Sequence, residues 1–308
     1  MIPLRPLGLG ELLDGAVSLT RRYPRPALGF SAGVALVSTA LNLLLVLTAW
    51  QPLLTLDSAT FTTNSRDQIE GALGGAALAG LGAIVISGLA TLVLTGVMTA
   101  IAGRAVLGQP MTVSEAWAQV RPALPRLLGV ALTTTALIYG AFALSIGLAV
   151  VAIMFVGPVG VAVAVLLVLA ATALSIHLYC RLALAPSVAL LENAGVRTSL
   201  RRSGVLARRS WWRILGILLL TVLIGSFVAQ IAQVPFLLFG AVPNGLGALT
   251  NPQGSTALLV WTSIGSGFAQ TIVAPFTSGV RALLYVDRRM RAEGLDVALA
   301  AAAATTAP

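Results

Sequence analysis

Long apolar stretches dominate the chain, and each is separated from the next by a short polar segment. Six of these stretches are long enough to cross the hydrocarbon layer of a bilayer, which takes about 20 residues of helix. We predict membrane-spanning helices at residues 27–49, 71–101, 127–156, 158–180, 214–239 and 256–284. The pattern therefore predicts an all-α fold, an integral membrane bundle of six transmembrane helices.

Shorter segments precede the first, third and fifth stretches, and their apolar residues recur at helical spacing. In the first segment, Leu9, Leu12 and Ala16 share one face, and Arg21 and Arg22 follow at the end. In the second, Thr112 and Glu115 have the spacing of a capping box. Amphipathic helices of this kind lie in the headgroup plane, where they either bind anionic lipid or only brace the bundle. Both interpretations are open.

Each amphipathic segment is followed by a Leu-Gly pair that opens a membrane span. The chain therefore reads as three tandem units in the same orientation, unlike the inverted repeats of many transporters. We place the units at residues 1–104, 105–186 and 187–296, within one membrane domain. Residues 297–308 are rich in alanine, and we expect them to be a disordered tail.

Composition agrees with a membrane protein and excludes a soluble domain. Of the 308 residues, 57% are apolar and 9% are charged, whereas a soluble domain averages about 45–50% apolar and about 25% charged residues. The net charge of +9 is explained by topology and by anionic lipid, so we expect no nucleic-acid partner.

The basic residues also predict the orientation of the chain. All 19 are arginine, and all except Arg66 fall on one side of the predicted membrane. Short loops that are rich in arginine stay in the cytoplasm. We therefore predict a multi-pass protein of the cell membrane with both termini in the cytoplasm. The N-terminus lacks the short apolar core and cleavage site of a secretory signal, so we expect the first helix to be an anchor.

Small residues recur at every fourth position of the second predicted span. Such a ridge lets a neighbouring helix approach closely. Static packing and sliding during transport are both open interpretations, and both require the ridge to contact another helix. The ridge consists of Gly71, Gly75, Ala79, Ala83, Ser87, Thr91, Thr95 and Thr99.

Polar side chains within the predicted spans form a second candidate feature. They could line a polar cavity beside Pro235 and Pro275, or they could form hydrogen bonds between helices. No carboxylate lies in the middle of a span, which argues against ion-coupled transport. A histidine could also titrate in a proton-linked role. The possible intramembrane polar cluster consists of Asn42, His177, Gln230, Gln233 and Gln270.

Several motifs of the chain resemble those of an actinobacterial family of polytopic membrane proteins. That family is similar to the membrane domain attached to some glycerophosphoryl diester phosphodiesterases. The resemblance implies a fold, because the phosphodiesterase site needs paired histidines and carboxylates around a divalent metal. One histidine and ten scattered acids do not supply such a site. The matching motifs are the opening Pro3–Ala16, Leu184-Ala185-Pro186, Glu192-Asn193, Leu200–Ser203, Trp212-Arg213 and the ending Leu283–Asp296.

These features predict a non-enzymatic scaffold or accessory subunit with no cofactor and no metal. Its basic cytoplasmic face would contact anionic lipid headgroups, with membrane or cytoplasmic proteins as further candidate partners. The alternative is a permease or lipid transporter with a route between the repeats, which a cavity around Gln230, Gln233 and Gln270 would favour. The predicted contact residues are Arg197, Arg201, Arg202, Arg208 and Arg209.

The topology makes the first testable prediction. Reporter fusions after Thr60 and Gly245 should read as extracytoplasmic, and fusions after Gly108 and Gly195 as cytoplasmic, because the arginines lie beside the second pair. An alkaline phosphatase reporter, active only outside the cytoplasm, measures this directly. A cytoplasmic signal at Gly245 would contradict six spans.

Overall fold

The computed structural model describes residues 8–50, 66–106, 112–156, 158–208, 210–242 and 256–293. Within these ranges every regular element is a helix, and no strand occurs. The predicted tail at 297–308 and Arg209 lie outside the described residues.

Among the described residues, six helices are long and apolar enough to span a membrane, and each contains or closely matches one predicted span. The predicted integral membrane bundle is therefore confirmed. The helices are α2 (Pro24–Leu45, continued by the π-helical segment η1, Val46–Trp50), α5 (Arg66–Val106), α7 (Leu124–Val156), α8 (Pro158–Leu182), α11 (Trp211–Ala241) and α13 (Thr256–Glu293).

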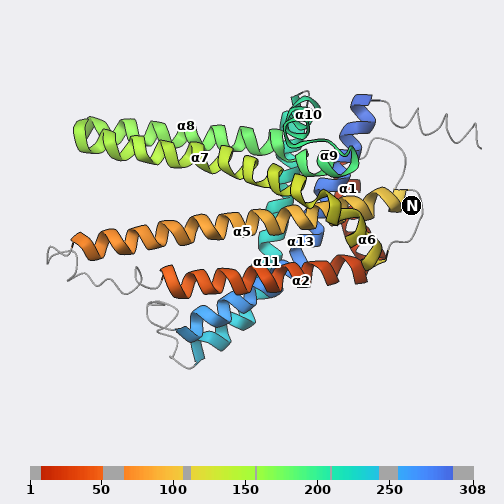
Figure 1. The fold of residues 1–308 in the computed structure, drawn as a ribbon, viewed down its shortest axis with the longest axis horizontal. Coiled ribbons are helices and arrows are strands. Elements are labelled where there is room, and N and C mark those ends of the chain that lie inside the picture. Colours follow the sequence, from red (N-terminus) through yellow and green to blue (C-terminus); the bar gives the residue numbers. More distant parts are fainter. Residues whose placement is uncertain are drawn as a thin grey trace, which may run out of the picture.

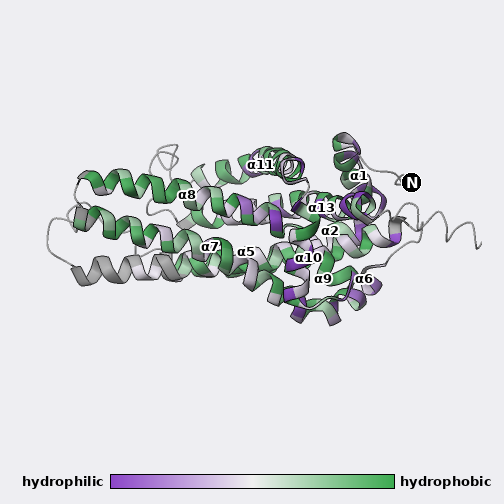
Figure 2. Ribbon diagram, turned by 90° about the horizontal axis from the view of Figure 1, so that it is seen from above, coloured by the Kyte–Doolittle hydropathy of each residue, from purple (hydrophilic) through white to green (hydrophobic). Residues whose placement is uncertain are grey.

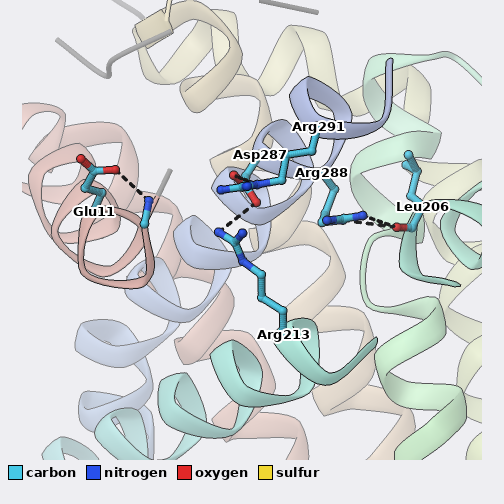
Figure 3. A network of polar contacts seen from close by, with 7 residues as sticks. Glu11, Leu206, Arg213, Asp287, Arg288 and Arg291 are labelled. Carbon is cyan, nitrogen blue, oxygen red and sulfur yellow. Dashed lines mark hydrogen bonds and ion pairs between the residues drawn. The ribbon is translucent and has the colours of Figure 1, made fainter. Parts of the chain in front are cut away.

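Three amphipathic helices precede the three pairs of long helices, as the sequence predicts. They are α1 (Leu9–Arg22), α6 (Val113–Val120) and α10 (Val196–Arg208). Glu11 closes the first turn of α1, because its carboxylate accepts a hydrogen bond of 2.7 Å from the backbone N–H of Gly8 (Figure 3). In α6 the predicted capping box forms, since Thr112 and Glu115 each accept a bond from the other's backbone N–H.

Two short helical elements were not predicted. The 3-10 turn η2 (Arg121–Ala123) joins α6 to α7, and α9 (Ala185–Leu191) joins α8 to α10. Pro186 lies in the first turn of α9, a position that suits proline because proline has no N–H to leave unpaired. Five of its seven residues are buried. A helix that is this short and this enclosed has no amphipathic period to detect in the sequence.

The long helices extend from one end of the molecule, at which α1, α6, α9, α10 and the last turns of α13 gather (Figure 1). We term this the arginine-rich end. Helix α7 packs along α8, and α11 packs along α13, which also contacts α1, α2 and α5. Hydrophilic residues concentrate at the arginine-rich end, while the far ends of the described α7 and α8 are mostly hydrophobic (Figure 2).

The hydrophobic core also lies toward the arginine-rich end. Its largest fully buried side chains include Leu12 of α1, Leu184 of the α8–α9 junction, Ile214 of α11 and Leu283 of α13. Helix α5 passes through the centre, with 56% of its most apolar window buried. The bundle is thus tightly packed at one end, and the helices present apolar side chains outward along the rest of their length.

The small-residue ridge of α5 is buried at Ala79 and again near the arginine-rich end. There Thr95 and Thr99 are buried, and the hydroxyl of Thr99 lies 3.0 Å from that of Ser187 on α9. Farther along, Ser87 is exposed and lines an open groove together with Ala83. The prediction of close packing along the whole ridge is therefore wrong at Ser87.

Helices α11 and α13 approach each other closely at Gly240. A Cβ atom on Gly240 would lie 3.0 Å from the Cα of Leu258, which is backbone and cannot rotate away. At Gly216, on the same helix, a Cβ would meet nothing within 4 Å. The contact between α11 and α13 therefore requires glycine at position 240 but not at position 216.

This pair of glycines makes the second prediction. Gly240→Ala should lower the free energy of unfolding by about 1–3 kcal/mol, because α11 and α13 must separate to admit the Cβ atom. The melting temperature of the full chain in detergent should fall accordingly. Gly216→Ala is the matched control, and it should leave stability unchanged or raise it by up to about 1 kcal/mol. Equal melting temperatures for the two variants would contradict the close approach.

Candidate functional site

The carboxylate of Asp287 is completely buried near the end of α13, between two guanidinium groups (Figure 3). Arg213 of α11 lies 3.5 Å from one carboxylate oxygen, and Arg291, one turn along α13, donates to the other at 2.9 Å. A buried carboxylate is costly unless it is paired and hydrogen-bonded. These arginines therefore allow α13 to place an acid inside the protein and link it to α11.

The next residue, Arg288, joins α13 to α10. Its side chain is 5% exposed, and its Nε and Nη2 atoms donate to the carbonyl oxygen of Leu206 at 3.3 and 3.2 Å (Figure 3). The last carbonyls of a helix lack partners within the helix and carry a partial negative charge. Arg288 satisfies one of these carbonyls in the last turn of α10. Helix α13 therefore caps and anchors α10.

A second polar chain holds the loop between α9 and α10. The hydroxyl of Tyr285 donates to Glu192 at 2.7 Å, and Glu192 also forms an ion pair with Arg202. The following residue, Asn193, has a φ of 50°, a left-handed conformation that asparagine tolerates well. Arg126 of α7 donates to its backbone and side-chain oxygens at 2.8 and 3.1 Å.

Residues that are far apart in the sequence thus meet at one place. The resemblance motifs at Leu184–Pro186, Glu192-Asn193, Leu200–Ser203 and the end of α13 all contribute buried residues or polar contacts to the arginine-rich end. In the C-terminal motif, Asp287 pairs with Arg291 of its own helix and with Arg213 of α11, and both Asp287 and Arg288 are buried. They connect helices and are not available for docking.

The predicted contact arginines divide into different environments. Arg202 is engaged by Glu192 and is only partly exposed. In contrast, Arg197, Arg201 and Arg208 are exposed, and no carboxylate in the described part of the chain pairs with them. We term these three side chains the α10 basic surface.

Contacts from α8 and α13 hold α10, and with it the α10 basic surface, in a fixed position. The hydroxyl of Ser203 donates to the carbonyl of Arg181 at 2.7 Å, which ties the middle of α10 to the end of α8. Gly204 lets the Arg181 guanidinium approach, since a Cβ there would lie 3.1 Å from its Nε atom. Together with the bond from Arg288 to Leu206, these contacts bury one face of α10 and leave its arginines outward.

The predicted intramembrane polar residues do not form one cluster. Gln270 of α13 accepts a hydrogen bond of 3.1 Å from the hydroxyl of Ser38 on α2, and Asn42 donates to the carbonyl of Ser38 at 2.8 Å. The bond between Ser38 and Gln270 favours the interpretation that Gln270 holds helices together, whereas the bond of Asn42 lies within α2. His177 is exposed, and its ring stacks at 5.9 Å on Trp211.

Gln230 and Gln233 lie apart from that contact, beside a small pocket of about 320 Å³ that Thr262 also lines. Gln270 is not among its lining residues. This pocket is therefore not the shared opening around all three glutamines that would favour transport.

Two larger grooves open between the long helices. One, of 1020 Å³, lies between α2, α5 and α6 and is almost entirely apolar, with Phe30 and Trp117 at one side. The other, of 450 Å³, lies between α5, α7, α8 and α13 and contains Arg281 and several hydroxyl groups. Neither groove was predicted, because each is formed by helices from different parts of the chain.

No family model, curated protein or solved structure matches this chain. The resemblance to phosphodiesterase membrane domains therefore stays a prediction. Among the residues that the structure describes, no three His, Cys, Asp or Glu side chains gather as metal ligands would.

The buried carboxylate makes the third prediction. Asp287→Asn should destabilise the protein by about 3–5 kcal/mol, because it leaves Arg213 and Arg291 without their shared counter-charge. Asp14→Asn, at an exposed position of α1, is the matched control and should change stability by less than about 0.5 kcal/mol. Thermal unfolding of the full chain in detergent measures both, and a stable Asp287→Asn variant would show that the pair contributes little.

Proposed function

We propose that this protein is a non-enzymatic membrane scaffold or accessory subunit whose basic cytoplasmic face contacts anionic lipid. The observation that carries the proposal is the α10 basic surface. Its three arginines point outward without acidic partners from the described chain, on a helix that buried contacts hold in place. Each arginine near an anionic bilayer surface contributes about 1 kcal/mol of attraction.

The proposal narrows the predicted set of contact residues. Arg202 is excluded because it pairs with Glu192, so its replacement would disturb the α9–α10 loop as well as the surface charge. Arg209 lies outside the described residues. The surface is also distinct from arginines that hold the fold, such as Arg213 and Arg288. A variant of the three outward arginines can therefore test contact without dismantling the core.

A second candidate function, lipid transport, is favoured by the 1020 Å³ groove between α2, α5 and α6. Its size and apolar lining suit an acyl chain. Proteoliposomes with a fluorescent phospholipid in both leaflets separate the two functions. A transporter would expose the inner-leaflet probe to an external quencher, whereas a scaffold would leave it protected.

The α10 basic surface makes the fourth prediction. Replacing Arg197, Arg201 and Arg208 together with Gln should reduce the phosphatidylglycerol that co-purifies from mixed phosphatidylglycerol–phosphatidylcholine membranes. Raising the salt should have the same effect on the parent, because exposed charges are screened over about 10 Å at 0.1 M salt. Lipid phosphorus and headgroup analysis measures the retained lipid.

The matched control replaces the same three arginines with Lys, which keeps the charge and should retain the lipid. Equal retention by the Gln variant and the parent at low salt would remove the lipid-contact role. The arginines would then serve orientation alone, as the positive-inside rule requires of any basic loop.

A further inference from the structure

The 450 Å³ groove between α5, α7, α8 and α13 combines one cationic side chain with hydroxyl groups and apolar walls. Arg281 and Pro186 lie toward the arginine-rich end of the groove, and Ala83 and Ile84 lie along α5 in the opposite direction. Helix α5 rises 1.5 Å per residue, so the stretch from Ala83 to Leu92 is about 13 Å long. The groove is thus elongated along the membrane-spanning direction.

Arg281 has one hydrogen-bond partner in the described chain. Its Nη2 atom donates to the hydroxyl of Tyr179 at 2.6 Å, and its guanidinium carbon lies 5.8 Å from the centre of that ring. A guanidinium carries five N–H donors. No aspartate or glutamate lines the groove, and no described carboxylate forms an ion pair with Arg281. The positive charge therefore faces the groove without a counter-charge from the protein.

Hydroxyl groups with spare bonding capacity line the same groove. Ser87 of α5 and Thr135 and Tyr139 of α7 line the groove, and none of their hydroxyls bonds to another described residue. In contrast, Thr91 and Thr134 return their hydroxyls to carbonyls of their own helices. The unused hydroxyls can donate to oxygen atoms of a ligand.

The remaining walls are apolar. The groove is also lined by Ile84 and Leu92 of α5 and by Ile138 of α7. A ligand that satisfies the whole surface must carry an anionic group at one end, ester or hydroxyl oxygens next to it, and a hydrocarbon chain beyond. A phospholipid has these parts in this order.

We propose that this groove binds one phospholipid, with its phosphate at Arg281 and an acyl chain along α5. The phosphate accepts the free N–H donors of the guanidinium, an arrangement that arginine favours because its planar donors match phosphate oxygens. The absence of acids from the lining gives a choline or ethanolamine cation no partner, so an anionic headgroup is preferred. The site does not rest on the α10 basic surface, since none of its residues comes from α10.

The test is native mass spectrometry of the delipidated full chain, titrated with dioleoyl phosphatidylglycerol. The parent should bind one lipid tightly, and Arg281→Gln should weaken that binding at least about tenfold, because a charge-assisted contact is lost. Arg25→Gln, at an exposed position outside both the groove and the α10 basic surface, is the matched charge control and should bind as the parent does. Equal affinity in the Arg281 variant and the parent would overturn the proposal.

A second variant keeps the test valid if Arg281→Gln fails to fold. Ser87→Leu changes an exposed position of α5, so it should leave the melting temperature unchanged. The larger side chain fills the groove, so the affinity for phosphatidylglycerol should still fall at least about tenfold. Unweakened binding by a folded Ser87→Leu variant would place the lipid elsewhere and overturn the proposal.

Two further probes separate a lipid phosphate from a free phosphate. Dioleoylglycerol has the same chains and no phosphate, and it should not bind measurably. Inorganic phosphate at millimolar concentration should not displace phosphatidylglycerol, because it gains nothing from the apolar walls. Displacement by phosphate, or binding of dioleoylglycerol as tight as that of phosphatidylglycerol, would overturn the lipid assignment.

Discussion

The burial of one carboxylate organises the arginine-rich end of this protein. Asp287 lies completely inside, between Arg213 of α11 and Arg291 of its own helix. Removing one partner from such a pair is strongly destabilising, because the charges that remain are buried without compensation. The same turn of α13 carries Tyr285 and Arg288, which reach the α9–α10 loop and the end of α10. One helical segment thereby joins the elements of this end.

The rigidity of this end contrasts with the looser packing along the spans. Lipid tails are as apolar as the side chains of the helices, so no hydrophobic force drives helices together within the membrane. Close contact there depends on local features, such as Gly240 against Leu258 or Thr99 against Ser187. Elsewhere along the described spans, the two lateral grooves open between helices.

Arginine serves three purposes in this chain, and the neighbouring residues distinguish them. Arg213 and Arg288 are structural, since they pair with a buried acid or with the end of a helix. The α10 basic surface faces outward and supports the proposed contact with anionic lipid. Arg281 faces a groove between helices, with a tyrosine hydroxyl as its protein partner. The proposed surface contact and the proposed lipid site are therefore separable by mutation.

The sequence by itself determined the six spans and the three amphipathic helices, because hydrophobicity and its helical period are local properties of the chain. The capping box at Thr112 and Glu115 was predictable for the same reason. Only the tertiary structure decided which charges are buried. Arg202 resembles Arg201 in sequence, yet only Arg202 reaches Glu192. The grooves and the separation of Gln270 from Gln230 likewise depend on how distant helices pack, a long-range arrangement that no local pattern encodes.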